Sequence, residues 1–252
     1  MTLRRVLLGV GVGAAVGLSA SAAWAQSISI DLGQGGITMR ALQLVALITV
    51  LSLAPSILVM VTSFTRIVVV LSLLRTALGT QTAPPNAVIV SLSLFLTLFV
   101  MAPTFSAAYQ AGVAPLVAGQ IQPQEAFTRA AGPFRIFMLA HVREKDLMMF
   151  VELAGGNGAA AQPAPTGPQD IALSTLIPAF MISELRRAIE IGFLLFVPFL
   201  VIDLVVASVL MSMGMMMLPP ALVSLPFKLI FFVLVDGWSL VAGSLVRSYT
   251  GG

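Results

Sequence analysis

The chain has 252 residues, of which 58% are hydrophobic and only 9% are charged. Soluble domains have about 25% charged residues, so this composition excludes an ordinary soluble protein and predicts a membrane-associated one. The formal charge of +3 gives no argument for nucleic-acid binding, and the absence of cysteine excludes disulfides, thiol catalysis and thiolate metal sites.

The first 25 residues have the pattern of a secretory signal peptide. A basic start, MTLRR, precedes an apolar run that ends in the small-x-small sequence Ala23-Trp24-Ala25. We expect cleavage between Ala25 and Gln26. The alternative is an uncleaved first membrane helix, a role for which the Gly- and Ala-rich run is weakly hydrophobic. Residues 26–40 are polar and Gly-rich, which predicts a flexible lead on the outer side of the membrane.

A first helical hairpin is predicted over residues 41–103. Its first arm, 41–62, is almost wholly apolar and contains Pro55, which should kink the helix. Its second arm, 87–101, should end at Pro103. Both arms have the composition of membrane segments.

The segment between these arms carries two arginines in an otherwise apolar helix. Arg66 and Arg75 are nine residues apart, or two and a half turns, so they should lie on different faces of the helix. Under the positive-inside rule they mark a cytoplasmic side. Gly79 and the following Pro84-Pro85 should end the helix.

Residues 104–153 are more polar, and their charges alternate with apolar positions at helical spacing. The pattern predicts an amphipathic helical region on the outer, periplasmic side, with a helix over 124–153 that breaks at Gly132-Pro133. Residues 154–170 are rich in Ala, Gly and Pro, so they are predicted to form a linker.

A second helical hairpin is predicted over residues 171–252, with arms at 191–212 and 221–246. The turn between these arms has no charge but contains five methionines: Met211, Met213, Met215, Met216 and Met217. Such a turn would be a poor surface in water and would leave unpaired amides in lipid, so we expect it to lie inside protein. Thioethers most often fill gaps in a core, but around a symmetry axis they would form a deformable ring, closed or fitted around an extended polypeptide.

Four charged residues precede the apolar part of this hairpin: Glu184, Arg186, Arg187 and Glu190. Glu184 can pair with Arg187 at i, i+3. Arg186 can pair with Glu190 at i, i+4, and both pairs are typical of a solvated helix start. The other interpretation is that one or two of these charges reach a neighbouring subunit and fix its register.

Three more charges stand among apolar residues of the hairpin: Asp203, Lys228 and Asp236. Such charges normally face a partner or a cavity. Asp203 and Lys228 lie at similar distances on either side of the turn, about 19 Å of helix each, so a mutual pair is predicted. The competing interpretation makes Asp203 a proton-relay carboxylate.

No metalloprotease, phosphate-binding or nucleophile motif occurs in the chain, so we expect neither an enzyme nor a cofactor. One function compatible with these charges is an ion or proton channel or transporter that uses Asp203 and Lys228, although the absence of internal repeats lowers its weight. Another is a structural membrane anchor without a pore.

Three long stretches resemble the FliP family of the flagellar type III export gate. They are TSFTRIVVVLSLLRTALGTQTAPPN, PFRIFMLAHVREKDLMMF and the run from ISELRRAIEIG through GMMMLPP to VDGW. The resemblance implies an all-α, membrane-associated protein whose long kinked helical hairpins assemble into a helical ring complex. The virulence injectisome subunits of the same family are the alternative, but the signal-like start and the long 104–175 region look flagellar.

The resemblance also implies partners and site residues. Copies of the chain would form a homo-oligomer with FliQ and FliR, beside other export-apparatus membrane proteins and lipid, around a pore for unfolded flagellar substrates. The place would be the bacterial inner membrane at the flagellar basal body, with much of the chain on the periplasmic side. The family's methionine gasket maps onto Met215, Met216 and Met217, in the turn that also holds Met211 and Met213. Its assembly charges map onto Glu184, Asp203 and Lys228, and Arg187 lies beside the first of them.

Overall fold

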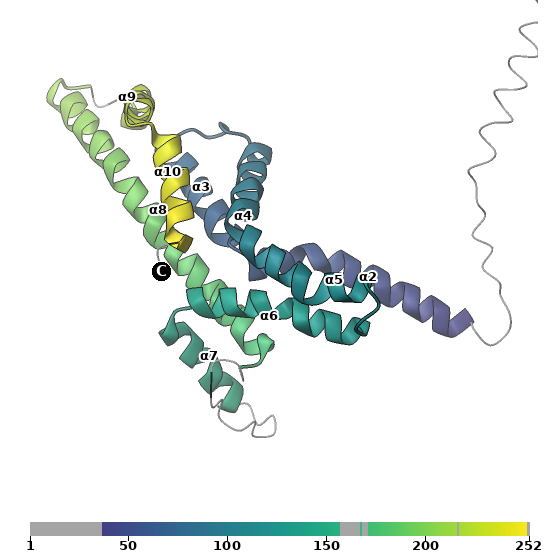
Figure 1. Cartoon of the computed structure of the whole chain (residues 1–252). Coiled ribbons are helices and arrows are strands. Elements are labelled where there is room, and N and C mark those ends of the chain that lie inside the picture. The colour runs from purple at the N-terminus through teal and green to yellow at the C-terminus, as the bar shows by residue number, and fades with distance from the viewer. Residues whose placement is uncertain (1–36, 157–166, 168–170, 216, 251–252) are drawn as a thin grey trace, which may run out of the picture. The chain divides into compact units, whose positions relative to one another are not determined.

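The computed structural model describes residues 37–156, 167, 171–215 and 217–250 (Figure 1). Regular structure in these ranges is entirely helical, which confirms the predicted all-α fold class. The chain divides into two compact units, residues 1–52 and 53–252. Of the first unit the structure describes only residues 37–52, which belong to α2 (Ile37–Val61). The predicted cleavage site at Ala25 and Gln26 lies outside the described residues, as does Met216.

Helix α3 (Phe64–Leu78) is central to the second unit. It packs on α8 and α4, and it contributes Ile67, Val70 and Leu74 to the core. The helix ends where the sequence predicts, because Gly79 adopts a φ of 78° and its amide donates to the carbonyl of Thr76 at 3.0 Å. Glycine enters this left-handed region without the steric cost that a Cβ imposes.

Helix α4 (Asn86–Ala108) does not end at Pro103 as predicted; it continues into η2 (Tyr109–Val113) and α5 (Ala114–Val117). Proline removes one backbone hydrogen bond, and local π-type adjustment and neighbouring helices can compensate for that loss in an apolar helix. The π turn brings Gly112 against α6, where a Cβ would lie 2.4 Å from the carbonyl oxygen of Ala126. Gly112 therefore permits this close backbone contact.

The predicted amphipathic helix over 124–153 is two helices, α6 (Pro123–His141) and α7 (Glu144–Gly156). The predicted break at Gly132-Pro133 is wrong, because α6 runs through both residues. The chain instead breaks at Val142, whose backbone is extended. Contacts of α6 with α4, η2 and α8 hold its proline-containing middle in place, and α7 packs separately on α8.

The second predicted hairpin is built from α8 (Leu173–Ser212), α9 (Pro220–Leu234) and α10 (Gly237–Thr250). The predicted arm 191–212 is only the second half of α8, whose 40 residues extend for about 60 Å. The predicted arm 221–246 is divided between α9 and α10, which meet at an angle of 63°. Figure 1 shows α8 as a single long rod, with α3 packed on it and the carboxyl end of α10 beside its middle.

The first half of α8 packs through residues spaced four apart, namely Leu176, Phe180, Glu184, Ala188 and Gly192. The first four of these are 0% exposed. At Gly192 a Cβ would lie 2.3 Å from the Leu73 side chain, so glycine lets α3 approach closely. This row forms an i, i+4 ridge that fits against neighbouring helices.

By length and composition, two helical stretches of the described chain could cross a membrane, Asn86–Val117 and Leu173–Ser212. A third candidate arises if the bent pair Pro220–Leu234 and Gly237–Thr250 counts as one span. The described chain thus offers two or three candidates, against the four segments predicted from the sequence. The difference comes partly from α9 and α10, which are each too short to cross about 30 Å of hydrocarbon alone.

Candidate functional site

A buried ion pair joins α3 to α8. The Nε of Arg66 donates to Oε2 of Glu184 at 2.9 Å, and its Nη2 donates to Oε1 of the same carboxylate. The side chains are 1% and 0% exposed. Because two parallel N–H···O bonds form, the pair is bidentate and its geometry is fixed as well as its charge.

The end of α10 completes this cluster. The hydroxyl of Tyr249 donates to Oε2 of Glu184, and the ring of Tyr249 lies 3.9 Å from the guanidinium carbon of Arg66. Nη1 of Arg66 donates to the hydroxyl of Ser248 at 3.0 Å. Each charge is therefore surrounded by partners, as a buried pair requires if it is not to destabilise the fold. The cluster connects three helices that are far apart in the sequence.

A second polar cluster attaches α7 to α8. The hydroxyl of Ser183 donates to Asp146 at 2.9 Å and accepts from the backbone amide of Arg143 at 3.0 Å. Arg186 lies 3.4 Å from Asp146, and Arg143 lies 3.0 Å from Glu190. Asp146 is almost fully buried, whereas the Arg143–Glu190 pair is exposed.

The two local pairs predicted on α8 are wrong. Glu184 binds Arg66 instead of Arg187, and Arg186 and Glu190 face Asp146 and Arg143. Groups brought by other helices occupy these positions, because tertiary packing overrides the weak preference of exposed i, i+4 pairs. Arg187 is half-buried and forms no ion pair with any residue in the described ranges.

A third cluster joins the two arms of the hairpin. Nζ of Lys228 lies 2.6 Å from Oδ2 of Asp203 and donates to the carbonyl of Ala77 at 3.3 Å. Ser224 donates to the other carboxylate oxygen at 2.5 Å. The predicted pairing of Asp203 with Lys228 is thus present, and it also holds the carboxyl end of α3. This position is favourable for a cation, because unpaired carbonyls accumulate at a helix carboxyl terminus.

The methionine turn begins with a helix-ending motif after Ser212. Gly214 has a φ of 73°, its amide donates to Met211, and the amide of Met215 donates to Leu210. These two bonds are those of a Schellman motif, which favours glycine at the left-handed position. Four methionines of the turn are exposed in the single chain: Met211 at 67%, Met213 at 66%, Met215 at 40% and Met217 at 98%.

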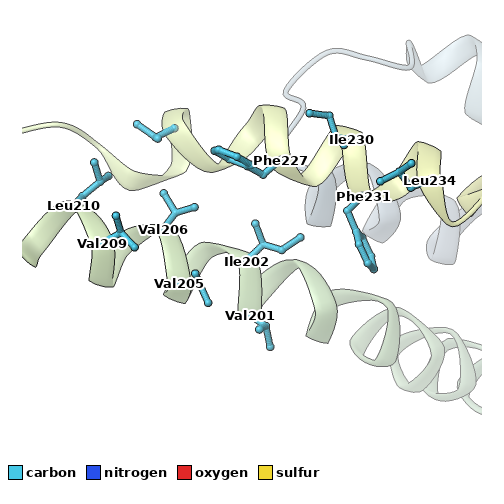
Figure 2. Close-up of a pocket in the computed structure, with 11 residues that line it drawn as sticks. Val201, Ile202, Val205, Val206, Val209, Leu210, Phe227, Ile230, Phe231 and Leu234 are labelled. Atoms are coloured by element: carbon cyan, nitrogen blue, oxygen red, sulfur yellow. The ribbon is translucent and has the colours of Figure 1, made fainter.

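An apolar groove lies between the two arms just before this turn (Figure 2). It has a volume of about 570 Å³. Its α8 side is formed by Val201, Ile202, Val205, Val206, Val209 and Leu210, and its α9 side by Val223, Phe227, Ile230, Phe231 and Leu234. Figure 2 shows Phe227 on α9 opposite Val206 on α8. The arms are therefore joined by the Asp203–Lys228 cluster but leave apolar surface between them.

Sequence reasoning missed Arg66, Asp146 and Tyr249 as structural partners. The positive-inside rule makes Arg66 a cytoplasmic marker, but its 1% exposure places it in the interior of the protein. An arginine in an apolar helix without a nearby acid was the available signal, since such a charge needs a distant partner. Nothing in the sequence around Tyr249 or Asp146 indicates which helix each one contacts.

The arrangement binds helices to one another and offers no constellation for catalysis. In the ranges that the structure describes, no group of three or more His, Cys, Asp or Glu side chains could hold a metal ion. The buried charges of the three clusters are paired with one another, and much of the surface around the methionine turn is apolar or sulfur-bearing.

Comparison with known proteins gives one consistent result. The FliP family model matches residues 47–245. The flagellar biosynthetic protein FliP of Caulobacter vibrioides is 60% identical over 251 residues, which are 99% of this chain and 92% of that protein. The protein of the same name from Bacillus subtilis is 53% identical, with 82% of this chain and 91% of the relative covered. That from Aquifex aeolicus is 50% identical, with 88% and 91% covered. The chain therefore belongs to the FliP family of flagellar biosynthetic proteins, which are part of the flagellar export apparatus.

Proposed function

We propose that this chain is a pore-forming subunit of the flagellar type III export gate. Several copies assemble with FliQ and FliR, in contact with lipid and other export-apparatus membrane proteins, and enclose a conduit for unfolded flagellar subunits. The assembly sits in the bacterial inner membrane at the basal body, with residues 104–153 on the periplasmic side. The two hairpins, 41–103 and 171–252, supply its walls.

The observation that carries this proposal is the exposure of the methionine turn. From Leu204 to Phe227 the chain contains no charged residue, yet Met211, Met213 and Met217 are at least 66% exposed. A contiguous apolar surface of this kind marks an interaction site. Flexible thioethers adapt to partners of different shape, which suits a ring that closes on itself or around an extended chain.

The pairing of three predicted assembly charges inside the subunit supports the same proposal. Glu184, Asp203 and Lys228 have partners within the chain, so their positions stabilise the subunit and the contact between its hairpin arms. We propose that neighbouring copies then cover the apolar faces that remain, including the groove between α8 and α9. Arg187 has no ion pair in the described chain, so of the predicted assembly charges it is the one that stays available to a neighbour.

Replacing the turn methionines tests the proposal. The triple change of Met215, Met216 and Met217 to Ala should let small solutes leak through the assembled complex, because it removes the side chains that close the ring. The matched change to Leu keeps the volume and should leak less. Solute entry into vesicles that contain the purified complex gives the measurement. Vesicles as tight as wild type with the Ala variant, in complexes of normal composition, would contradict the proposal.

An ion or proton channel through Asp203 is less well supported. Lys228 neutralises this carboxylate at 2.6 Å, and Ser224 occupies its other oxygen. Proton flux through the purified chain alone that stops with Asp203→Asn would favour the channel and count against the export gate.

A further inference from the structure

Asp236 lies at the break between α9 and α10 and belongs to none of the three polar clusters. Its φ of 50° lies in the left-handed region, which residues with a Cβ rarely adopt. Packing holds this conformation: at the next residue, Gly237, a Cβ would lie 2.1 Å from the ring of Phe232. Trp238 meets the same ring edge to face at 5.4 Å. The break is therefore a packed feature that presents Asp236 in a fixed position.

The carboxylate of Asp236 has no partner in the described part of the chain. It is exposed, and no hydrogen bond or ion pair to it is formed by residues in those ranges. The side chains just before it, Val233 and Leu234, are 77% and 80% exposed, so the anion stands in an apolar surface. Glu184 and Asp203, by contrast, are both paired. An ionised group among apolar residues of a membrane protein points to a missing cation.

Arg75 is the cation that best fits this requirement. It lies in the last turn of α3, half-buried, and its Nη1 donates only to neutral oxygens, those of Asn86 and Pro84. No carboxylate in the described residues pairs with it. Arg75 and Asp236 belong to the same end of the second unit, because Lys228, two turns before Asp236, donates to the carbonyl of Ala77 at the end of α3. Arg75 is on α3 and Asp236 lies between α9 and α10, and the two form no ion pair within the described residues of one chain.

We propose that Asp236 of one copy forms an ion pair with Arg75 of the next copy around the ring. The inference rests on the assembly proposed above and names the polar contact that sets its register. An acid at one position and a base at another position of the same end can form a head-to-tail contact, which repeats from copy to copy around an axis. The guanidinium can also bind a carboxylate through two parallel bonds, which fixes the angle between copies.

Arg247 is the competing cation, and the geometry disfavours it. Asp236 immediately precedes α10 and Arg247 lies in the last turn of that helix, so the two charges are at opposite ends of α10. A contact between them would pair two copies of α10 antiparallel, about a two-fold axis. Such a dimer would not surround a pore.

Cysteine cross-linking tests the proposal cleanly, because the chain has no cysteine of its own. The variant with both Asp236→Cys and Arg75→Cys is produced together with the partner subunits, and isolated membranes are treated with a short bis-maleimide. We expect a ladder of linked copies, which neither single variant produces. The control variant combines Asp236→Cys with Arg247→Cys and should give no ladder and no linked dimer.

A charge exchange gives the second measurement. Asp236→Arg and Arg75→Asp should each lower the yield of the oligomer by about tenfold or more, and the double exchange should recover most of it. If the single charge variants still form normal oligomers and the 236–75 cysteine pair gives no ladder, this contact is overturned and the ring stays intact. A 236–247 dimer, or a wild-type chain that stays monomeric in extracts containing the partner subunits, would overturn both the contact and the proposed ring.

Discussion

The two halves of α8 have opposite surfaces. In the first half every fourth residue from Leu176 to Ala188 is fully buried, including a charged one, Glu184. In the second half most of the large apolar side chains are exposed, with Phe193, Leu194 and Leu204 all above 60%, and only a few such as Phe199 are buried. A single helix thus buries a charged residue, Glu184, in one half and exposes large apolar side chains in the other.

This contrast separates the part of the molecule that builds the subunit from the part that meets its surroundings. A buried charge is destabilising when its partner is lost, so the first half of α8 must keep its internal contacts fixed. Burying exposed apolar side chains away from water is favourable whatever covers them, so the second half of α8 suits contact with lipid and with neighbouring copies. The predictions below test whether the two halves respond as differently as this account requires.

The largest effect is expected for Glu184→Gln. Arg66 would stay buried without a counter-charge, and the free energy of unfolding of the purified subunit in detergent should fall by about 3–5 kcal/mol. The matched control is Glu190→Gln on the same helix, where the partner Arg143 is exposed and the loss should be at most about 1 kcal/mol. Equal losses in the two variants, measured by thermal unfolding, would contradict the assigned difference between buried and exposed pairs.

A smaller loss is expected for Lys228→Met. The side chain of Asp203 is 32% exposed, so water stabilises the carboxylate that remains, and a decrease of about 1–3 kcal/mol in unfolding free energy should follow. The contact between α8 and α9 should loosen first. Relative to wild type, amide hydrogen exchange should rise more in α9 than in α6. Unchanged exchange in α9 would argue that the Asp203–Lys228 cluster does not hold α9 on α8.

These contacts also show what the sequence could predict. The end of α3 at Gly79 and the pair Asp203–Lys228 follow from local rules, the left-handed glycine and the equal distances from one turn. The partner of Glu184 could not be found in this way, since Arg66 is 118 residues away and the local Arg187 satisfies the i, i+3 pattern. The continuation of α4 through Pro103 could not be predicted for a related reason. Proline disfavours the interior of a helix, and contacts with neighbouring helices stabilise α4 despite it.

A moderate, local effect is expected for Gly214→Ala. The φ of 73° is unfavourable for a residue with a Cβ, so the variant should lose about 1–2 kcal/mol, confined to the end of α8. Hydrogen exchange of the amides from Leu210 to Met215 should rise, while the core around Arg66 stays protected. A loss of protection throughout α8 would show that the turn and the buried half are not independent.

The smallest effect on the isolated subunit is expected for Met217→Ala. This side chain is 98% exposed, so its removal should change the unfolding free energy by no more than about 0.5 kcal/mol. Thermal unfolding in detergent, beside Met138→Ala as the buried counterpart at 1% exposure, gives the comparison; the buried change should cost about 2–5 kcal/mol. A large loss for Met217→Ala would mean that the turn stabilises the subunit itself.

Electron cryomicroscopy of the complex extracted with its partner subunits tests the central claim most directly, through the position of residues 211–217. The account predicts that these turns from successive copies converge on a common axis, while the Arg66–Glu184 pairs stay inside each subunit. Turns that point toward lipid or bulk water, away from any axis, would contradict it.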